Sequence, residues 1–302
     1  MSCFSRGVSK VGNTQIFARL TGKGTQYLVY QMDYVAEEPT AVILPLPVAS
    51  PGEEKCVYFM NLKGYNTFFS DLSDGFPAIH LPTRGENTPA NKKLAKQRVG
   101  DYFASFVPSV DDFEKLDPEF AISKETWAKI PNYRDYSFAV FQLAELKGKP
   151  SPIALEFETR MPDKVFFPTL QIHDGKFHRQ KFYKHELYLQ HASLDSRVGE
   201  YISGNYADGS TGLIRSKDAA GEFCQCDDSR GIVMPGLLVH RVDMVGPLAN
   251  GDVLMPMEGD PVVRPVDFRP VKAMAPWGAV LGGVSWLIYR RNLRRKEKQQ
   301  GA

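Results

Sequence analysis

The sequence has few cysteines, four in 302 residues, which is too few for a disulfide scaffold. It contains no Asn-x-Ser/Thr sequon, and its start, MSCFSRGVSK, lacks the run of roughly 7 to 15 apolar residues that a secretory signal needs. It has neither a Gly-rich phosphate loop followed by Lys nor the Gly-x-Ser-x-Gly frame of a nucleophile elbow. Nothing here predicts export, nucleotide binding or serine-hydrolase chemistry.

The chain has no large excess of charge of either sign, because 37 Lys plus Arg stand against 35 Asp plus Glu. The balance is uneven along it, because residues 271–302 carry seven basic side chains and one acidic one. The remainder has 30 basic against 34 acidic side chains, a net charge of −4. A nucleic-acid-binding face is expected to be basic, so we predict no nucleic-acid partner.

Strand patterns fill the first 60 residues. Residues 25–34 alternate two faces, which is typical of a half-buried strand. Residues 41–48 form an apolar run that contains Pro45 and Pro47. Because prolines two apart remove donors from the same side of a strand, we expect this segment at a sheet edge or leaving the sheet.

Short helices follow. Tyr65, Phe68, Phe69 and Leu72 have helical spacing, and Gly75 is placed to end the helix. Ser109 and Ser123 precede two further short patterns as capping residues.

Strands return over residues 137–190, and Asp174-Gly175 predicts the turn of a long hairpin over residues 165–189. Residues 195–235 hold six glycines and no sustained period, which predicts an irregular excursion or a break between two subdomains. We therefore expect residues 1–270 to form a sheet-rich body, α+β to mainly β with antiparallel sheets and a few short helices, followed by residues 271–302 as a hydrophobic helix with a basic tail.

The C-terminal segment Ala273 to Tyr289 has 17 consecutive uncharged residues. As a helix it would rise about 25 Å, close to the lower limit for a membrane span. Its expected anchor residues are Trp277, Gly278, Gly282, Trp286, Tyr289, Arg290 and Arg291. The aromatic ends, the Gly-x-x-x-Gly spacing and the basic flank predict a single-pass membrane protein, with lipid and another membrane protein as partners and the body outside the cytoplasm. A cytoplasmic or peripheral protein, with this helix in its core or at the membrane surface, is the alternative.

Histidines are concentrated in one stretch, where His173, His178, His185 and His191 fall within 19 residues. In a hairpin turning at Asp174-Gly175, only His173 and His178 share a face at close range. They are the candidate metal pair, set against the simpler interpretation of exposed hairpin histidines.

Cys224 and Cys226 are separated by one residue, which is not zinc-finger spacing, and no second Cys pair accompanies them. We expect free thiols, with a weaker possibility that they belong to a metal or redox site.

The first 75 residues or so resemble an uncharacterised bacterial domain family. The resemblance is carried by Cys3, the short strand Gln15 to Ala18, a strand ending at Tyr34, the stretch Leu44-Pro45-Leu46-Pro47-Val48, and the helix near Phe68 to Leu72. It implies an exported protein with a C-terminal helical anchor, and it implies no activity.

The function these patterns favour is a non-catalytic, membrane-anchored binding or accessory domain, with no cofactor, since no catalytic set has an arguable geometry. The alternative is a soluble hydrolase or metal-dependent enzyme that uses the region of His173 and His178.

Overall fold

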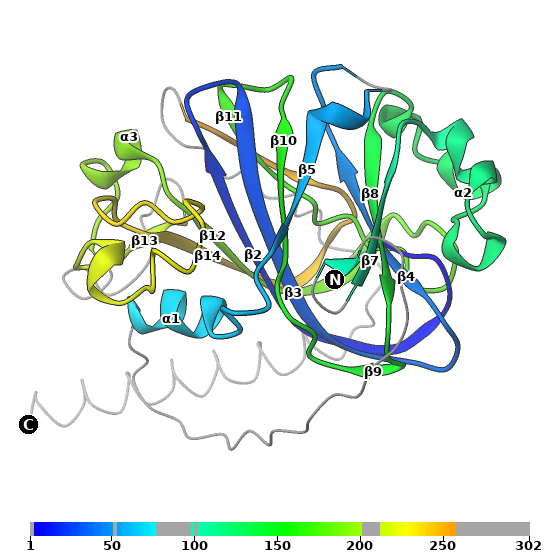
Figure 1. Cartoon of the computed structure of the whole chain (residues 1–302), viewed down its shortest axis with the longest axis horizontal. Helices are drawn as coiled ribbons and strands as arrows, with labels where there is room; N and C mark the ends of the chain where they lie inside the picture. Colours follow the sequence, from blue (N-terminus) through cyan, green and yellow to red (C-terminus); the bar gives the residue numbers. More distant parts are fainter. Residues whose placement is uncertain (1–2, 51–52, 77–97, 100–101, 201–211, 258–302) are drawn as a thin grey trace, which may run out of the picture. The chain divides into compact units, whose positions relative to one another are not determined.

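The structure is a computed structural model (Figure 1), which describes residues 3–50, 53–76, 98–99, 102–200 and 212–257. These residues fall within one compact unit, Met1–Asp267. They confirm the expected fold class at the level of a sheet-rich protein with a few short helices. The C-terminal hydrophobic helix lies outside the described residues.

Two large sheets make up most of the described chain. The five-stranded sheet has the order β1 (Cys3–Phe4), β4 (Ala41–Leu46), β8 (Ser137–Leu143), β7 (Tyr102–Val107), β6 (Arg98–Val99). The eight-stranded sheet has the path β13 (Ile214–Arg215), β14 (His240–Ala249), β12 (Gln180–Leu189), β2 (Val8–Leu20), β3 (Thr25–Ala36), β10 (Ile153–Glu158), β5 (Val57–Asn61), with β9 (Lys147–Gly148) paired to β3. A separate pair joins β11 (Lys164–Phe167) to β15 (Val253–Pro256).

The helices are short. The α-helices are α1 (Phe68–Asp74), α2 (Lys124–Trp127) and α3 (Ala192–Asp195), and the 3₁₀ turns are η1 (Glu54–Cys56), η2 (Val110–Lys115), η3 (Pro118–Phe120), η4 (Pro131–Tyr133) and η5 (Ala220–Glu222). As expected, Gly75 ends α1 and the Ser123 side chain caps α2. Ser109 precedes η2, but its hydroxyl bonds Asp112 instead of a backbone amide.

The eight-stranded sheet is buried on both faces. Successive side chains of its central strands point to opposite sides, and each side packs against a hydrophobic core. Ile16, Leu28 and Leu187 belong to the core shared with the five-stranded sheet, where the rings of Phe59 and Phe141 meet with centroids 5.4 Å apart. The sheet's other face packs against α1 and segment 213–239, and Figure 1 shows α1 beneath it.

The segment expected at a sheet edge forms β4, which lies one strand in from the edge, between β1 and β8, and ends before Pro47. It pairs with β8 along its whole length, whereas β1 pairs only with Val42 and Ile43 on the other side. Pro45 lies beyond the reach of β1, so its missing N–H removes no ladder bond there.

The predicted hairpin over residues 165–189 is wrong. β11 pairs with β15, and β12 lies between antiparallel β14 and parallel β2. Gly175 does adopt the positive φ that a tight turn requires. The turn therefore exists, but the chain on either side of it joins different sheets. The β2–β12 pair also makes this sheet mixed and not purely antiparallel.

The expected membrane localisation is corrected. No helix in the described part of the chain has both the length and the apolar character needed to span a bilayer. Ala273 to Tyr289, with its expected anchor residues, lies outside that part. This finding overturns the predicted single-pass membrane protein and, with it, the predicted orientation of the body outside the cytoplasm.

Candidate functional site

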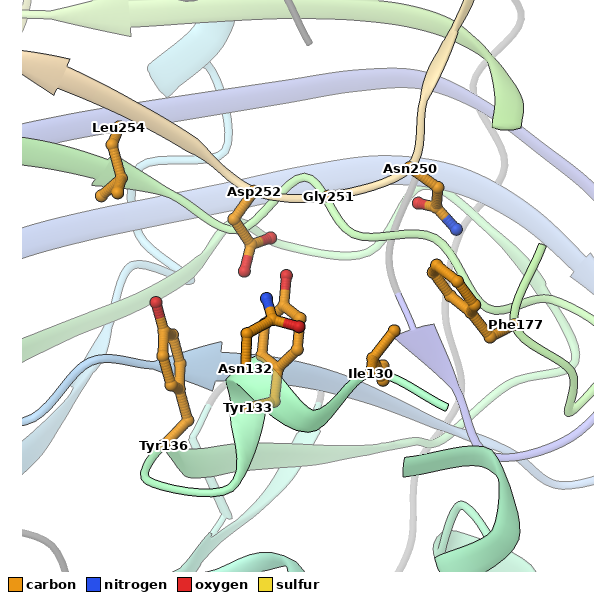
Figure 2. A pocket seen from close by; sticks show the side chains of 9 residues that line it. All are labelled: Ile130, Asn132, Tyr133, Tyr136, Phe177, Asn250, Gly251, Asp252 and Leu254. Carbon is orange, nitrogen blue, oxygen red and sulfur yellow. The ribbon is translucent and has the colours of Figure 1, made fainter. Parts of the chain in front are cut away.

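A pocket opens where the turn between β14 and β15 meets η4 (Figure 2). The turn is Asn250-Gly251-Asp252. Asn250 holds it rigidly: its Nδ2 donates to the carbonyls of Gln171 and His178 at 2.8 and 2.9 Å, and its Oδ1 accepts from the Gln171 amide at 2.8 Å. One amide side chain thus ties the turn to the extended segment before β12.

The opposite wall comes from η4, which Pro131 begins because a fixed φ suits the first position of a helical turn. The turn presents Tyr133 and Tyr136, whose ring centroids are 5.0 Å apart. Trp127 supports Tyr133 from behind at 6.2 Å. Aromatic packing therefore fixes this wall.

The cavity has a volume of about 250 Å³ and is lined by Ile130, Asn132, Tyr133, Tyr136, Phe177, Asn250, Gly251, Asp252 and Leu254. This is below the range of roughly 300 to 1,000 Å³ typical of sites for drug-sized ligands and cofactors. It suits a single side chain or a small ion better than a nucleotide.

Asp252 is the only acidic side chain in the lining, and Figure 2 shows its carboxylate directed toward the hydroxyl end of Tyr133. Its Oδ1 accepts a hydrogen bond from the Leu170 amide at 2.8 Å. Its Oδ2 is shut off from solvent, and the Tyr133 hydroxyl, which lies near enough to affect the pKa of Asp252, does not reach hydrogen-bonding geometry with it. A buried acceptor without a hydrogen bond lowers the stability of a fold by about 1 to 3 kcal/mol. A ligand that donates a hydrogen bond to this oxygen would remove that cost.

Burial raises the pKa of Asp252 to about 7, against the lowering effect of the Leu170 amide and the facing Tyr133 hydroxyl. No Lys, Arg or His of the described residues forms an ion pair with it. At neutral pH the carboxyl is therefore poised between its neutral and charged forms.

The tyrosines and the Cys3 thiol around Asp252 stay neutral. Burial first, and the Asp252 charge second, raise the pKa of Tyr133 and of the Cys3 thiol, and raise the pKa of Tyr136 to about 12. The same two causes contribute to the raised pKa of Tyr183. Arg160 lies 4.6 Å from the Tyr136 ring centroid and pairs with Asp135 at 2.9 Å.

Chemically, the arrangement offers one acceptor oxygen, phenol hydroxyls and aromatic walls. None of the residues lining the pocket is a His, Lys, Cys or Ser, so the lining contains neither a Ser–His nor a Cys–His pair.

The structure places the sequence-predicted metal candidates in different settings. His173 is half-buried with its ring edge-on to Phe4, 5.9 Å between centroids, and burial lowers its pKa to about 3. His178 is exposed and its Nε2 lies 2.8 Å from Asp174 Oδ2. The pair thus has one half-buried member and one exposed member.

Cys224 and Cys226 belong to the core around α1, on the other face of the eight-stranded sheet. Burial raises the pKa of Cys224 to about 12 and raises that of Cys226. Thiols with raised pKa values are weak nucleophiles and weak ligands at neutral pH. Among the described residues, no three His, Cys, Asp or Glu side chains gather as metal ligands.

Sequence reasoning missed Asp252, Tyr133 and Tyr136. Asn250-Gly251 is a turn signal in the sequence, but nothing beside it marks the following Asp252 as buried. The available signal was Ile130-Pro131, which begins η4, but nothing local says that η4 packs over a turn 120 residues later.

No protein-family model matches the chain, and no curated protein matches it. The resemblance to a bacterial domain family therefore stays a prediction. Among solved structures, baculovirus P35 is 14% identical over 82% of this chain and 96% of P35, with a TM-score of 0.45. A mutated P35 after caspase cleavage and the caspase-8/P35 complex give 13% identity and TM-scores of 0.40 and 0.42, covering 82% and 81% of this chain and 98% and 96% of theirs. At these TM-scores the likeness supports no inference about this chain.

Proposed function

We propose that this protein is a non-catalytic binding module that recognises a partner protein through the pocket at Asp252. The observation that carries the proposal is the unpartnered Oδ2 of Asp252 at the inner end of an aromatic cavity. A rigid turn and a packed aromatic wall hold the two sides in place, so the site is formed before binding. Preformed sites lose little conformational entropy when a ligand enters.

The size of the cavity favours a protein partner over a cofactor. About 250 Å³ accommodates one inserted side chain, and interfaces typically depend on a few such anchors in desolvated pockets. Ile130, Phe177 and Leu254 supply apolar contacts around it.

The proposal is tested by panning a displayed random-peptide library against the full-length protein. The Asp252→Asn protein, which keeps the shape of the pocket and loses its charge, serves for counter-selection. We expect enriched sequences that bind the wild-type chain and are recovered intact by mass spectrometry. Absence of any enrichment over the Asp252→Asn protein refutes the proposal, and cleaved peptides refute its non-catalytic part.

The metal-enzyme alternative makes a different prediction. Stoichiometric zinc or iron in the purified protein, lost when His173 and His178 are both changed to Ala, would favour it. The pairing of His178 with Asp174 and the burial of His173 give that alternative no supporting geometry.

A further inference from the structure

We infer that the side chain captured by the pocket is a lysine of the partner protein, its ammonium bound at Asp252 Oδ2. This inference rests on the proposed function and specifies its ligand. It follows from the number of free acceptor oxygens, the composition of the walls and the charge left unmatched.

The acceptor geometry selects between the two basic side chains. Asp252 Oδ1 already accepts from the Leu170 amide, so Oδ2 alone is available. Arginine binds a carboxylate best through two parallel N–H···O bonds to both oxygens, whereas an ammonium is a compact charge that needs one. A single free oxygen therefore favours lysine.

The walls match the rest of a lysine side chain. Tyr133, Tyr136 and Phe177 line the cavity, and the faces of aromatic rings attract ammonium groups. Ile130 and Leu254 offer apolar contact to the four-carbon stem. Asn132 lines the cavity and is exposed, so it leaves a polar group where the partner's backbone would approach.

Charge complementarity supports the same ligand. The charged groups near the cavity are Asp252 itself and the Asp135–Arg160 pair, which neutralises its own charge. The neutral neighbours Cys3, Tyr133, Tyr136 and Tyr183 do not compensate Asp252. An arriving ammonium supplies the missing positive charge and the missing donor together.

The experiment uses three peptides of the form acetyl-Gly-Ala-X-Ala-Gly-amide, with X as lysine, arginine or norleucine, and free n-butylammonium. Dissociation constants for the full-length protein are measured by chemical-shift titration at pH 8 and pH 6. We expect the lysine peptide to bind about 10- to 100-fold more tightly than the norleucine peptide at pH 8, the effect of one charge-assisted hydrogen bond. Protonation of Asp252 should reduce this affinity about tenfold at pH 6, since the tyrosines and Cys3 do not titrate in that range.

Two variants and a control locate the effect. Asp252→Asn should abolish the preference for lysine over norleucine. Phe177→Leu, which leaves the carboxylate untouched, should weaken lysine binding several-fold. Asp163→Asn changes the net charge equally at a side chain that is 55% exposed outside the pocket, and should change nothing.

The outcomes separate this inference from the proposed function. Equal binding of lysine and norleucine, tighter binding of arginine, or lysine selectivity that survives in Asp252→Asn overturns the inference. Binding of n-butylammonium as tight as that of the lysine peptide also overturns it, because the source would then be a small amine. If panning yields pocket-dependent peptides without lysine, the binding function stands and only the lysine assignment fails.

Discussion

Replacing Asp252 by Asn should make the protein more stable, and the gain should grow with pH. Asn keeps an oxygen to accept the Leu170 amide, whose bond to Asp252 Oδ1 is 2.8 Å long. It cannot ionise, so the folded chain no longer has to hold a charge in a buried site. The substitution therefore isolates the cost of that charge.

The sign follows from where the proton is held. The pKa of Asp252 is about 7 in the folded chain, against an ordinary value of 3.8, so between these values the folded chain holds a proton that the unfolded chain has released. Its stabilising contribution is complete below pH 3.8 and is lost as pH rises through 7. Each pH unit inside this window is worth about 1.4 kcal/mol, so the difference between the variant and the wild type should grow by about 2.5 kcal/mol between pH 5 and pH 8.

The assay is urea unfolding at pH 5, 6, 7 and 8, with both proteins followed by circular dichroism. Half-buried His173 and buried His240 have pKa values lowered to about 3 and 4, so they make stability rise with pH, the opposite trend. They are present in both proteins and cancel in the difference. A difference in the free energy of unfolding between variant and wild type that stays constant from pH 5 to pH 8 would refute the argument that ionising the buried Asp252 destabilises the fold. The control variant Asp163→Asn should differ from wild type by the same amount at every pH.

Three further predictions concern the framework around the site. Asn250→Ala should lower the free energy of unfolding by about 1 to 2 kcal/mol, because it removes hydrogen bonds to two partly buried backbone groups of Gln171 and to the exposed carbonyl of His178. A loss below 0.5 kcal/mol in urea melts would contradict this. Arg19→Lys should increase amide hydrogen exchange in segment 229–233. The guanidinium donates to the carbonyls of Gly231 and Ile232 at 2.6 and 2.7 Å, and an ammonium cannot make both bonds in the same geometry. Unchanged exchange would argue against this role of Arg19. Cys226 should react with iodoacetamide before the other cysteines, because it alone of the four is not buried. Peptide mapping by mass spectrometry gives the order of labelling. Faster labelling of Cys56 or Cys224 would show that burial does not control reactivity.

Local patterns predicted the elements whose stability is local. The spacing of Phe68, Phe69 and Leu72 predicted α1, and Gly75 ends it as expected. The alternation in residues 25–34 predicted β3, although this strand is buried on both faces and not one. In such cases the period of the side chains is itself the cause of the structure.

Pairing partners were not predictable in the same way. The Asp174-Gly175 signal correctly marked a turn, but a hairpin also requires its two arms to pair, and β11 and β12 find better partners in β15 and β14. Those partners lie some 60 or more residues away in sequence. The pocket was missed for the same reason, because the burial of Asp252 is produced by η4 from a distant part of the chain.

The position of β12 has a consequence for synthesis on the ribosome. Gln15 of β2 bonds Glu186 of β12, 171 positions later, and β12 is completed on its other edge only by β14. When β2 and β3 leave the ribosome, the edge of β2 that will receive β12 has no partner yet. Domains with such high contact order fold slowly, and an exposed strand edge is prone to aggregation in the interval. During translation the nascent hairpin of β2 and β3 is therefore where a chaperone would be needed most, until residues 180–189 have been made and supply the neighbour of β2.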